Sequence, residues 1–485
     1  MKPAEKQLVV ELLQRIAQLE QLVGILILER DEARAEAAMS KAKLAERDEE
    51  IARLKSNSTN SHKPSSADGY AKPDPKSLRT PSGKKSGGQP GHSGMTLKKS
   101  ENPDRIVPHL PPLICDTCGS TLPQATMTET RQVHDIPKPK YEVTEHQVFA
   151  SCCACGKVHC GAFPNDVKAS VQYGPNAKAF AVHLTMDQML PLARTGELFD
   201  SMFGMPLSDA TILAMQREAA EKCAPHAEAI AKALLNAPVI HPDETGFRAE
   251  MKLHWIHTVA TAVLTWLGAH AKRGREAMDA GGILPKYKGI AVHDCWGPYF
   301  GDEYGFTHAL CDAHLGRELV FVHETTKQKW AKQLKSLLWS ANRDVKRNGG
   351  VLPPELLTRY HAHYDRLLAE GEVLNPPPPP SKKPKRGRKK RGKTGSLVAR
   401  MKEWKDAVWR FATVKEVPFT NNLAEQAVRM PKVKQKVSGC FRTKEGLDRF
   451  CAIRTVTATA KKQGLDALET LTALFCGQQV ALRMG

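Results

Sequence analysis

The fold is decided by two short stretches, PVIHPDET at residues 238–245 and KGIAVHDCW at residues 288–296. Each contains a β-prone apolar run that leads to an aspartate, Asp243 in the first stretch and Asp294 in the second. Between them, LHWIHTVATAVLTWLGAH accounts for two more strands and REAMDAGG for a helix. A series of strand, strand, strand, helix and strand is typical of a mixed α/β fold.

The acids in these stretches form a candidate metal site. Two adjacent strands that end in aspartates would place the carboxylates of Asp243 and Asp294 at one edge of a sheet, and hard oxygen ligands suit Mg²⁺ or Mn²⁺. Glu425, in TNNLAEQAVR, is the third candidate because it lies one helical turn from Arg429, on the same face. Two such ions roughly 4 Å apart promote displacement at phosphorus by activating the attacking oxygen and stabilising the leaving one.

Each acid also has a structural interpretation. An aspartate after a strand commonly caps a turn, and Glu425 follows Asn422 by three residues, as in a capping box. The joint placement of the three acids favours the metal site. Secondary candidates are Glu244, beside Asp243, and four residues of CDAHLGREL, of which His314 is a possible contact to substrate or metal: Asp312, His314, Arg317 and Glu318.

The charge of the chain points to nucleic acid. Its 485 residues include 71 Lys+Arg and 52 Asp+Glu, which leaves a net charge of +19. Such an excess favours a polyanionic partner, because each neutralised phosphate releases counterions. The basic segment 429–462 supplies candidate DNA contacts, namely Arg429, Lys432, Lys434, Lys436 and Arg442. No run approaches the ~18 apolar residues of a membrane span. The first residues also lack the pattern of a signal peptide. We therefore expect a cytoplasmic, nucleoid-associated protein that binds DNA rather than a membrane.

Six of the 12 cysteines fall in one short window. Cys115-x-x-Cys118 and Cys152-x-x-Cys155 are two knuckles of the type that present four thiolates to a structural Zn²⁺. Three neighbours are possible substitutes at the second knuckle: Cys153, His159 and Cys160. The alternative is a set of free buried thiols.

The amino-terminal residues predict a long coiled-coil helix. Apolar residues recur at heptad positions a and d from Val9 to Leu54, strongly at both ends and weakly in the middle. The pattern favours a homo-oligomer through this helix; a single helix packed on the protein's own core is the alternative.

The expected organisation is multidomain. It comprises a coiled-coil helix (1–55), a disordered basic linker (56–105), a zinc-binding domain (106–165), a helical DNA-binding or linker region (166–236), a catalytic core with the first two acids (237–325), a helical insertion (326–411) with a Pro/Lys/Arg-rich loop (376–393), and the Glu425 helix with the carboxy-terminal helices (412–485).

These motifs resemble, in order and over nearly the whole chain, the transposases of the insertion-sequence 66 family, which belong to the DDE superfamily. The similarity is carried by NSTNSHKPSSADG, GGQPGH, CDTCG, CCACG, HPDET, HDCWGPY, CDAHLGREL and TNNLAEQAVRMPKVKQKVSG. It implies a ribonuclease-H-like core with Asp243, Asp294 and Glu425 as the metal-binding triad. It also implies cleavage at the element's terminal inverted repeats and joining of the 3′ hydroxyls to target DNA, by direct displacement and without a covalent protein intermediate. Such elements often encode accessory proteins.

Two other functions fit parts of the sequence. A non-catalytic, zinc-containing dimeric DNA-binding regulator would explain the charge, the cysteines and the coiled coil, but not the ordered acids. A structure-specific nuclease with a ribonuclease-H-like fold would explain the acids, but it would cleave without joining 3′ ends.

Overall fold

The computed structural model describes residues 3–54, 91, 97–137, 139–376 and 392–485. Most of the predicted basic linker (56–105) and of the Pro/Lys/Arg-rich loop (376–393) lies outside these residues. The chain divides into a smaller unit, formed by 77–172 and 193–208, and a larger one, formed by 1–76, 173–192 and 209–485. Among the helices described, none has the length and apolar character needed to cross a bilayer.

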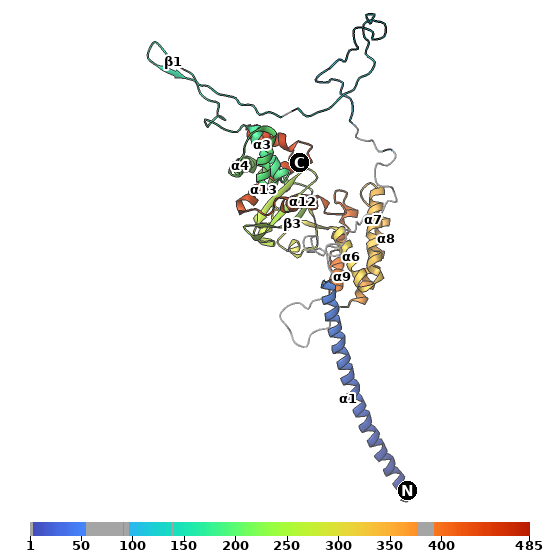
Figure 1. Ribbon diagram of the computed structural model, residues 1–485. Helices are drawn as coiled ribbons and strands as arrows, with labels where there is room; N and C mark the ends of the chain where they lie inside the picture. Colours follow the sequence, from blue (N-terminus) through green and yellow to red (C-terminus); the bar gives the residue numbers. More distant parts are fainter. Residues whose placement is uncertain (1–2, 55–90, 92–96, 138, 377–391) are drawn as a thin grey trace. The chain divides into compact units, whose positions relative to one another are not determined.

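A five-stranded mixed sheet forms the centre of the larger unit (Figure 1). β3 (Val239–Ala249), β4 (Lys252–Ala260) and β5 (Thr265–His270) are consecutive antiparallel strands. β6 (Ile290–His293) and β7 (Thr307–Leu310) extend the sheet in parallel on the other side of β3, which gives the order β5-β4-β3-β6-β7. With α5 (Arg275–Ala280) before β6, the predicted series of elements and the mixed α/β class are confirmed.

β3 is longer than the sequence suggested. We expected the strand to end at Asp243, but it continues to Ala249 because β4 supplies backbone partners along its whole length, with Asp243 opposite Thr258. The turn to β4 places Glu250 and Met251 at φ values of 52° and 58°, the left-handed region that a tight hairpin requires. Contacts from a distant segment hold this turn: the Glu250 amide donates to the Phe441 carbonyl (3.1 Å), and the Lys444 amide donates to the Glu250 carboxylate (3.0 Å).

Helix α13 (Lys444–Lys462) protects the β5 edge of the sheet. The amides of Thr265 and Leu267 donate to the hydroxyls of Thr459 and Thr455, each at 3.0 Å. An edge strand otherwise presents unpaired amides that can pair with another chain, so these threonines close the edge within the fold. Around this side of the sheet lie α4, α2, the π-helical turn η2 and α14, which span Asp209–Leu234, Pro175–Val182, His183–Asp187 and Ala467–Phe475.

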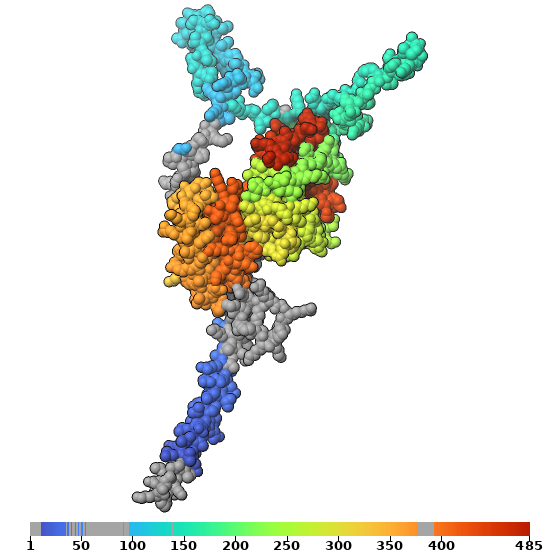
Figure 2. Space-filling view, turned by 180° about the vertical axis from the view of Figure 1, so that it is seen from behind, coloured from blue at the N-terminus to red at the C-terminus, as the bar shows by residue number. Residues whose placement is uncertain are grey.

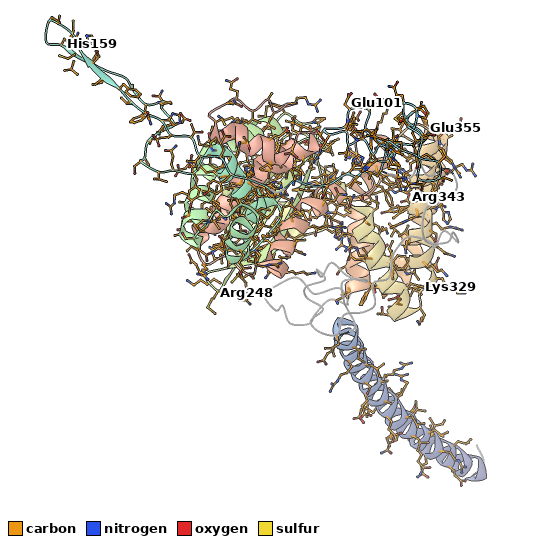
Figure 3. All side chains as sticks on the ribbon, turned by 45° about the horizontal axis from the view of Figure 1, so that its top comes forward. Glu101, His159, Arg248, Lys329, Arg343 and Glu355 are labelled. Atoms are coloured by element: carbon orange, nitrogen blue, oxygen red, sulfur yellow. The ribbon has the colours of Figure 1, made fainter. Side chains whose placement is uncertain are left out.

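The β7 side of the sheet carries a helical lobe, the region predicted as the insertion. Trp330, Tyr364 and Trp409 are fully buried in its core. Gly371 allows a close approach there, since a Cβ at this position would lie 3.0 Å from the Trp330 ring. Figure 2 shows the lobe as the orange mass beside the yellow-green sheet, and Figure 3 labels Lys329 and Arg343 near opposite ends of α7. Its helices are α6 (Asp312–Thr326), α7 (Lys329–Arg347), α8 (Pro354–Leu374), α9 (Lys393–Glu403), α10 (Lys405–Val408) and α11 (Arg410–Thr413).

Helix α1 (Pro3–Leu54) is one continuous helix, as predicted for the amino terminus (Figure 1). Its large apolar side chains are exposed, among them Ile16 at 50% and Leu19 at 57%. An apolar helix surface of this size is typical of an interaction face.

The smaller unit contains the cysteine window and a short hairpin of β1 (Ala150–Cys152) and β2 (Val158–Cys160). His159, labelled in Figure 3, lies on β2 and is exposed. The unit also includes most of α3 (Leu192–Phe203).

Candidate functional site

The two aspartates lie at the same level of the sheet. β3 and β6 pair in parallel with Val239 opposite Ile290 and Ile240 opposite Ala291, and the same offset separates Asp243 from Asp294. Burial raises the pKa of Asp243 well above its ordinary value, and the charges of Glu244, Asp294 and Glu425 raise it further. The structure thus brings the three predicted acids close enough for their charges to act on one carboxyl group.

Asn421 places Glu425 beside β3. Its side-chain amide donates to the Pro242 carbonyl (2.8 Å), and its side-chain oxygen lies 2.9 Å from His241 Nδ1. Helix α12 (Asn422–Val437) begins at the next residue, with the Glu425 amide donating to the Asn421 carbonyl (3.2 Å). No side chain caps this helix, so the capping-box interpretation of Glu425 is wrong: the asparagine that precedes the helix anchors it to the neighbouring strand instead.

The Glu425 carboxylate lies close to α6. Its Oε1 atom is 3.7 Å from His314 Nδ1 and 3.6 Å from an Arg317 guanidinium nitrogen. Among the residues that the structure describes, Cys311, His314 and Glu425 are the one group of three potential ligands whose atoms all lie within 4.8 Å of one another. The carboxylate oxygens of the three predicted acids are not all within 4.8 Å of one another.

Glu244 is held by a cluster of polar and aromatic groups next to Asp243. Arg273 donates to its carboxylate at 2.6 and 2.9 Å, and the Tyr299 hydroxyl donates to the other oxygen at 2.7 Å. The guanidinium of Arg273 lies over the rings of Trp255 and Trp296. These contacts fix Glu244 and offset its charge.

A pair of histidines supports the segment that carries Asp294. His293 is fully buried. Its Nε2 atom lies 2.9 Å from His308 Nδ1, and its Nδ1 atom lies 2.5 Å from the Asp294 carbonyl oxygen. Burial lowers the pKa of His293 to about 3, so the ring is neutral at physiological pH. The Asp294 carboxylate accepts a hydrogen bond from the Trp296 amide (2.9 Å). Asp294 therefore does cap a turn, as the structural interpretation held.

The donor set fits a hard divalent cation. Asp243, Asp294 and Glu425 offer carboxylate oxygens, and like charges that raise the pKa of Asp243 would be relieved by a cation among them. The same residues suit Mg²⁺ or Mn²⁺ better than a soft metal, since none of the three offers sulfur or nitrogen.

A stripe of basic residues on α12 leads away from Glu425. Arg429, Lys432 and Lys436 follow Glu425 at spacings of four, three and four residues, which places them on one face of the helix. Arg429 and Lys436 are exposed. Lys432 is half-buried; burial lowers its pKa, and the nearby charge of Asp243 acts in the opposite direction. The stripe therefore runs from the acids to solvent.

The other predicted DNA contacts differ in position. Lys434 lies off the stripe: its Nζ donates to the Ser438 hydroxyl (2.7 Å) and sits over the Phe441 ring, and burial lowers its pKa to about 8. Arg442 is exposed beyond the end of α12.

Two of the secondary candidates lie away from the acids. Glu318 pairs with Arg400 on α9 at 2.5 Å. Asp312 is fully buried, and its carboxylate oxygens have no hydrogen-bond partner among the described residues. Burial raises the pKa of Asp312 well above its ordinary value, which favours the neutral form of the group.

A tight backbone turn closes at the end of each cysteine knuckle. The Gly119 amide donates to the Cys115 carbonyl (3.0 Å), and the Gly156 amide donates to the Cys153 carbonyl (2.8 Å). Both glycines follow the second cysteine of a knuckle and have positive φ, 74° and 87°. Within the described part of the chain, the sulfurs of the four predicted zinc ligands are not gathered within 4.8 Å.

Sequence reasoning missed Asn421, Arg273 and Tyr299. Asn421 belongs to TNN, directly before the Glu425 helix, where the capping interpretation assigns a role to Asn422 instead. Arg273 and Tyr299 reach Glu244 only through the fold, from positions 29 and 55 residues away in the sequence.

Comparison with known families assigns the chain to a family. The profile of the Transposase IS66 family matches residues 170–449. The chain belongs to the IS66 transposase family. A second profile, of a family of unknown function (DUF6444), matches residues 2–98. No curated protein matches the chain.

The match places the candidate acids of this IS66 transposase inside the family region. Residues 170–449 include Asp243, Asp294 and Glu425, together with all five strands of the central sheet and the helical lobe. The cysteine window precedes the match, and α1 falls in the region of the second profile.

Proposed function

We propose that this transposase is a DDE enzyme that cuts DNA at the ends of its insertion sequence and joins the freed 3′ hydroxyls to target DNA. Asp243, Asp294 and Glu425 are its metal-binding acids, in a ribonuclease-H-like core. The observation that carries the proposal is geometric: β6 pairs in parallel with β3 just before the two aspartates, and Asn421 fastens the start of the Glu425 helix to Pro242, the residue before Asp243. The mixed sheet supports the same core.

The reaction consists of two displacements at phosphorus. Water attacks the phosphate at the element end and the bond to the 3′ oxygen breaks, which leaves a free 3′ hydroxyl on the element. That hydroxyl then attacks a target phosphate, a new phosphodiester bond forms, and the target 3′ oxygen leaves. Mg²⁺ or Mn²⁺, when bound, activates the attacking oxygen and stabilises the leaving one.

The protein's own residues hold the reactants. Asp243 must be ionised to take part in cation binding. Arg273 forms an ion pair with the adjacent Glu244, so that Glu244 does not compete with Asp243 for the cation. Arg429, Lys432 and Lys436 bind the phosphates that flank the scissile bond, because guanidinium and ammonium groups form charge-assisted hydrogen bonds with phosphate oxygens. DNA is the partner, both as terminal inverted repeats and as target.

We further propose a structural zinc in the smaller unit and self-association through α1. Cys115, Cys118, Cys152 and Cys155 would hold the zinc as four thiolates. The Ser120 hydroxyl contact lowers the pKa of Cys118 to about 7, which favours the thiolate that a zinc site needs. Elemental analysis is expected to find about one zinc per folded chain; its absence would contradict the site.

A strand-transfer assay tests the main proposal. Purified protein, terminal-repeat DNA and Mn²⁺ should give joined product, and Asp294→Asn should reduce it by about 100-fold or more, since a bound metal supplies several kcal/mol of charge stabilisation. DNA binding should be retained. Asp302→Asn, an exposed aspartate on a nearby loop, is the matched control and should be as active as the parent.

Two results would support other functions. Cleavage without end specificity and without joining would identify a nuclease. DNA binding with no reaction in Mg²⁺ or Mn²⁺ would identify a regulator.

A further inference from the structure

His314 and Arg317 of α6 both face the carboxylate of Glu425. The two residues lie three positions apart, on one face of the first turns of the helix. His314 Nδ1 and a guanidinium nitrogen of Arg317 lie 3.7 and 3.6 Å from the same atom, Glu425 Oε1. All three side chains are largely buried, with 14%, 21% and 31% of their areas exposed. A charge pair at this depth is screened less by salt than one on an open surface.

The contact between the two residues fixes the orientation of the imidazole. An Arg317 guanidinium nitrogen lies 3.2 Å from His314 Nε2. A guanidinium has no acceptor atom, so Arg317 donates and Nε2 accepts. The neutral ring then carries its proton on Nδ1, the atom that faces Glu425. Both residues thus place a nitrogen within ion-pair distance of one carboxylate oxygen, slightly beyond the length of a hydrogen bond.

The fold holds α6 and α12 at a fixed separation. The Asn421 amide donates to Cys311 Sγ (3.1 Å), and the Asp312 amide donates to the Phe419 carbonyl (3.1 Å). On the other side of α6, the Trp339 ring covers Gly316, where a Cβ would lie 2.3 Å from the ring. The contact with Glu425 therefore belongs to the packed structure rather than to a mobile surface.

We propose that His314 and Arg317 are positioning residues that hold the Glu425 carboxylate in the orientation in which it binds the catalytic cation. The inference rests on the proposed function, because it assigns a role relative to Glu425 as a metal ligand. In this proposal, His314 and Arg317 support the metal ligand Glu425 but do not bind the cation themselves.

The same atoms admit a different interpretation, a site for a thiophilic cation built from Cys311, His314 and Glu425. Three contacts favour positioning instead. Arg317 lies 3.2 Å from His314 Nε2, which assigns the proton of a neutral ring to Nδ1; Cys311 Sγ already accepts the backbone amide of Asn421; and the positive charge of Arg317 lies 3.6 Å from the carboxylate.

Direct Mn²⁺ binding provides the test. Calorimetry or Mn²⁺ electron paramagnetic resonance is carried out on the full chain and on Arg317→Ala, His314→Ala and Glu425→Gln, with strand transfer measured in parallel. Arg317→Ala and His314→Ala are expected to weaken Mn²⁺ binding roughly 10-fold, the usual effect of losing a group that orients a metal ligand. Strand transfer should recover at higher Mn²⁺ concentration. Arg366→Ala, an exposed arginine on α8, is the matched control and should bind Mn²⁺ as the parent does.

The sign of the Arg317 effect separates positioning from simple electrostatics. Loss of a positive charge alone would tighten cation binding, so weaker binding identifies the orienting role. His314→Gln should bind Mn²⁺ more tightly than His314→Ala, because its amide can still donate to Glu425; a merely structural role would show no such rescue.

The outcomes separate this inference from the proposed function. If both alanine variants bind Mn²⁺ as tightly as the parent or more tightly, while Glu425→Gln weakens binding, the positioning role is overturned and the proposed function stands. If Glu425→Gln leaves both Mn²⁺ binding and strand transfer unchanged, the proposed function itself fails. A Co²⁺–thiolate absorption component that disappears in Cys311→Ser, while the contribution of the cysteine knuckles remains, would overturn positioning in favour of the thiophilic site.

Discussion

The charge state of Asp243 depends on its surroundings. Burial raises its pKa, and the charge of Glu244 is the next largest cause. A carboxyl group with a raised pKa is ionised, and able to bind a cation, only above that pKa. Metal-dependent activity should therefore be present on the alkaline side and disappear as the pH falls through the pKa of Asp243.

Glu244→Gln should shift this acid limb to lower pH. The substitution removes a negative charge next to Asp243 and leaves the positive charge of Arg273 unneutralised, and both changes lower the pKa of Asp243. The measurement is the pH dependence of strand transfer at saturating Mn²⁺, with Asp302→Asn as the control. A shift to higher pH would contradict the electrostatic account.

The candidate acids could be found from the sequence because their signals are local. Asp243 and Asp294 each follow a short apolar run, and Glu425 lies near the start of an amphipathic helix beside Arg429. The residues that hold them could not be found in this way. Arg273 and Asn421 act across the fold, and nothing in their own neighbourhoods distinguishes them from an ordinary surface cation or a helix-capping amide.

At the level of elements, the position of α12 depends on Asn421. Asn421→Ala would leave the Pro242 carbonyl without its buried donor and His241 without its partner. We expect a loss of about 1–3 kcal/mol in the free energy of unfolding, the usual effect of a buried polar group left unpaired. Strand transfer should fall as well, because the helix that carries Glu425 loses its anchor to β3.

Urea denaturation measures the first effect. Asn422→Ala, at the next and exposed position, is the control and should change stability by less than about 0.5 kcal/mol. Equal stability of the two variants would show that the Asn421 contacts do not determine the helix position.

Helix α1 should determine the oligomeric state. Ile16→Glu combined with Leu19→Glu places charges in the predicted seam, where burial against a second helix would be unfavourable. Light scattering after size exclusion should show a smaller assembly for this variant, whereas Glu20→Gln should leave the mass unchanged. If deletion of residues 9–54 also leaves the mass unchanged, the heptads are not the association surface.

Element boundaries were less predictable than element types. The apolar run before Asp243 indicated a strand, but the remainder of β3 contains few apolar residues and is a strand because β4 pairs with it. The end of β3 was therefore set by a partner that the local sequence does not show.

At the scale of the whole molecule, the excess of positive charge should make DNA binding strongly dependent on salt. The slope of log K against log salt is about −0.9 for each phosphate neutralised. Arg429→Gln and Lys436→Gln should each reduce the slope by about one contact, since both side chains lie on the exposed stripe. Lys434→Gln is the internal control: its ammonium is engaged by Ser438 and Phe441, so the slope should stay the same. If the slope falls equally in all three variants, the DNA is attracted by the overall positive charge and does not bind along a defined row of side chains on α12.

The sequence was most informative about the broad organisation of the chain. Charge and strand–acid patterns indicated a DNA-processing α/β protein, and the match over residues 170–449 agrees. The cysteine spacing predicts zinc ligands, yet spacing alone does not determine whether distant knuckles meet, because that depends on residues 119–151 between them.

The turn at Glu250 and Met251 links two distant parts of the larger unit. Both residues are non-glycine and have a left-handed backbone conformation, which costs roughly 1 kcal/mol or more for each. The hydrogen bonds with Phe441 and Lys444 offset that strain. Asparagine and glycine at these positions would make the hairpin self-sufficient, but they would also remove the carboxylate that holds the Lys444 amide. The hairpin turn would become more stable, but the segment between α12 and α13 would lose a hydrogen bond to it. The local stability of the turn and the attachment of this distant segment therefore place opposite demands on the residue at position 250.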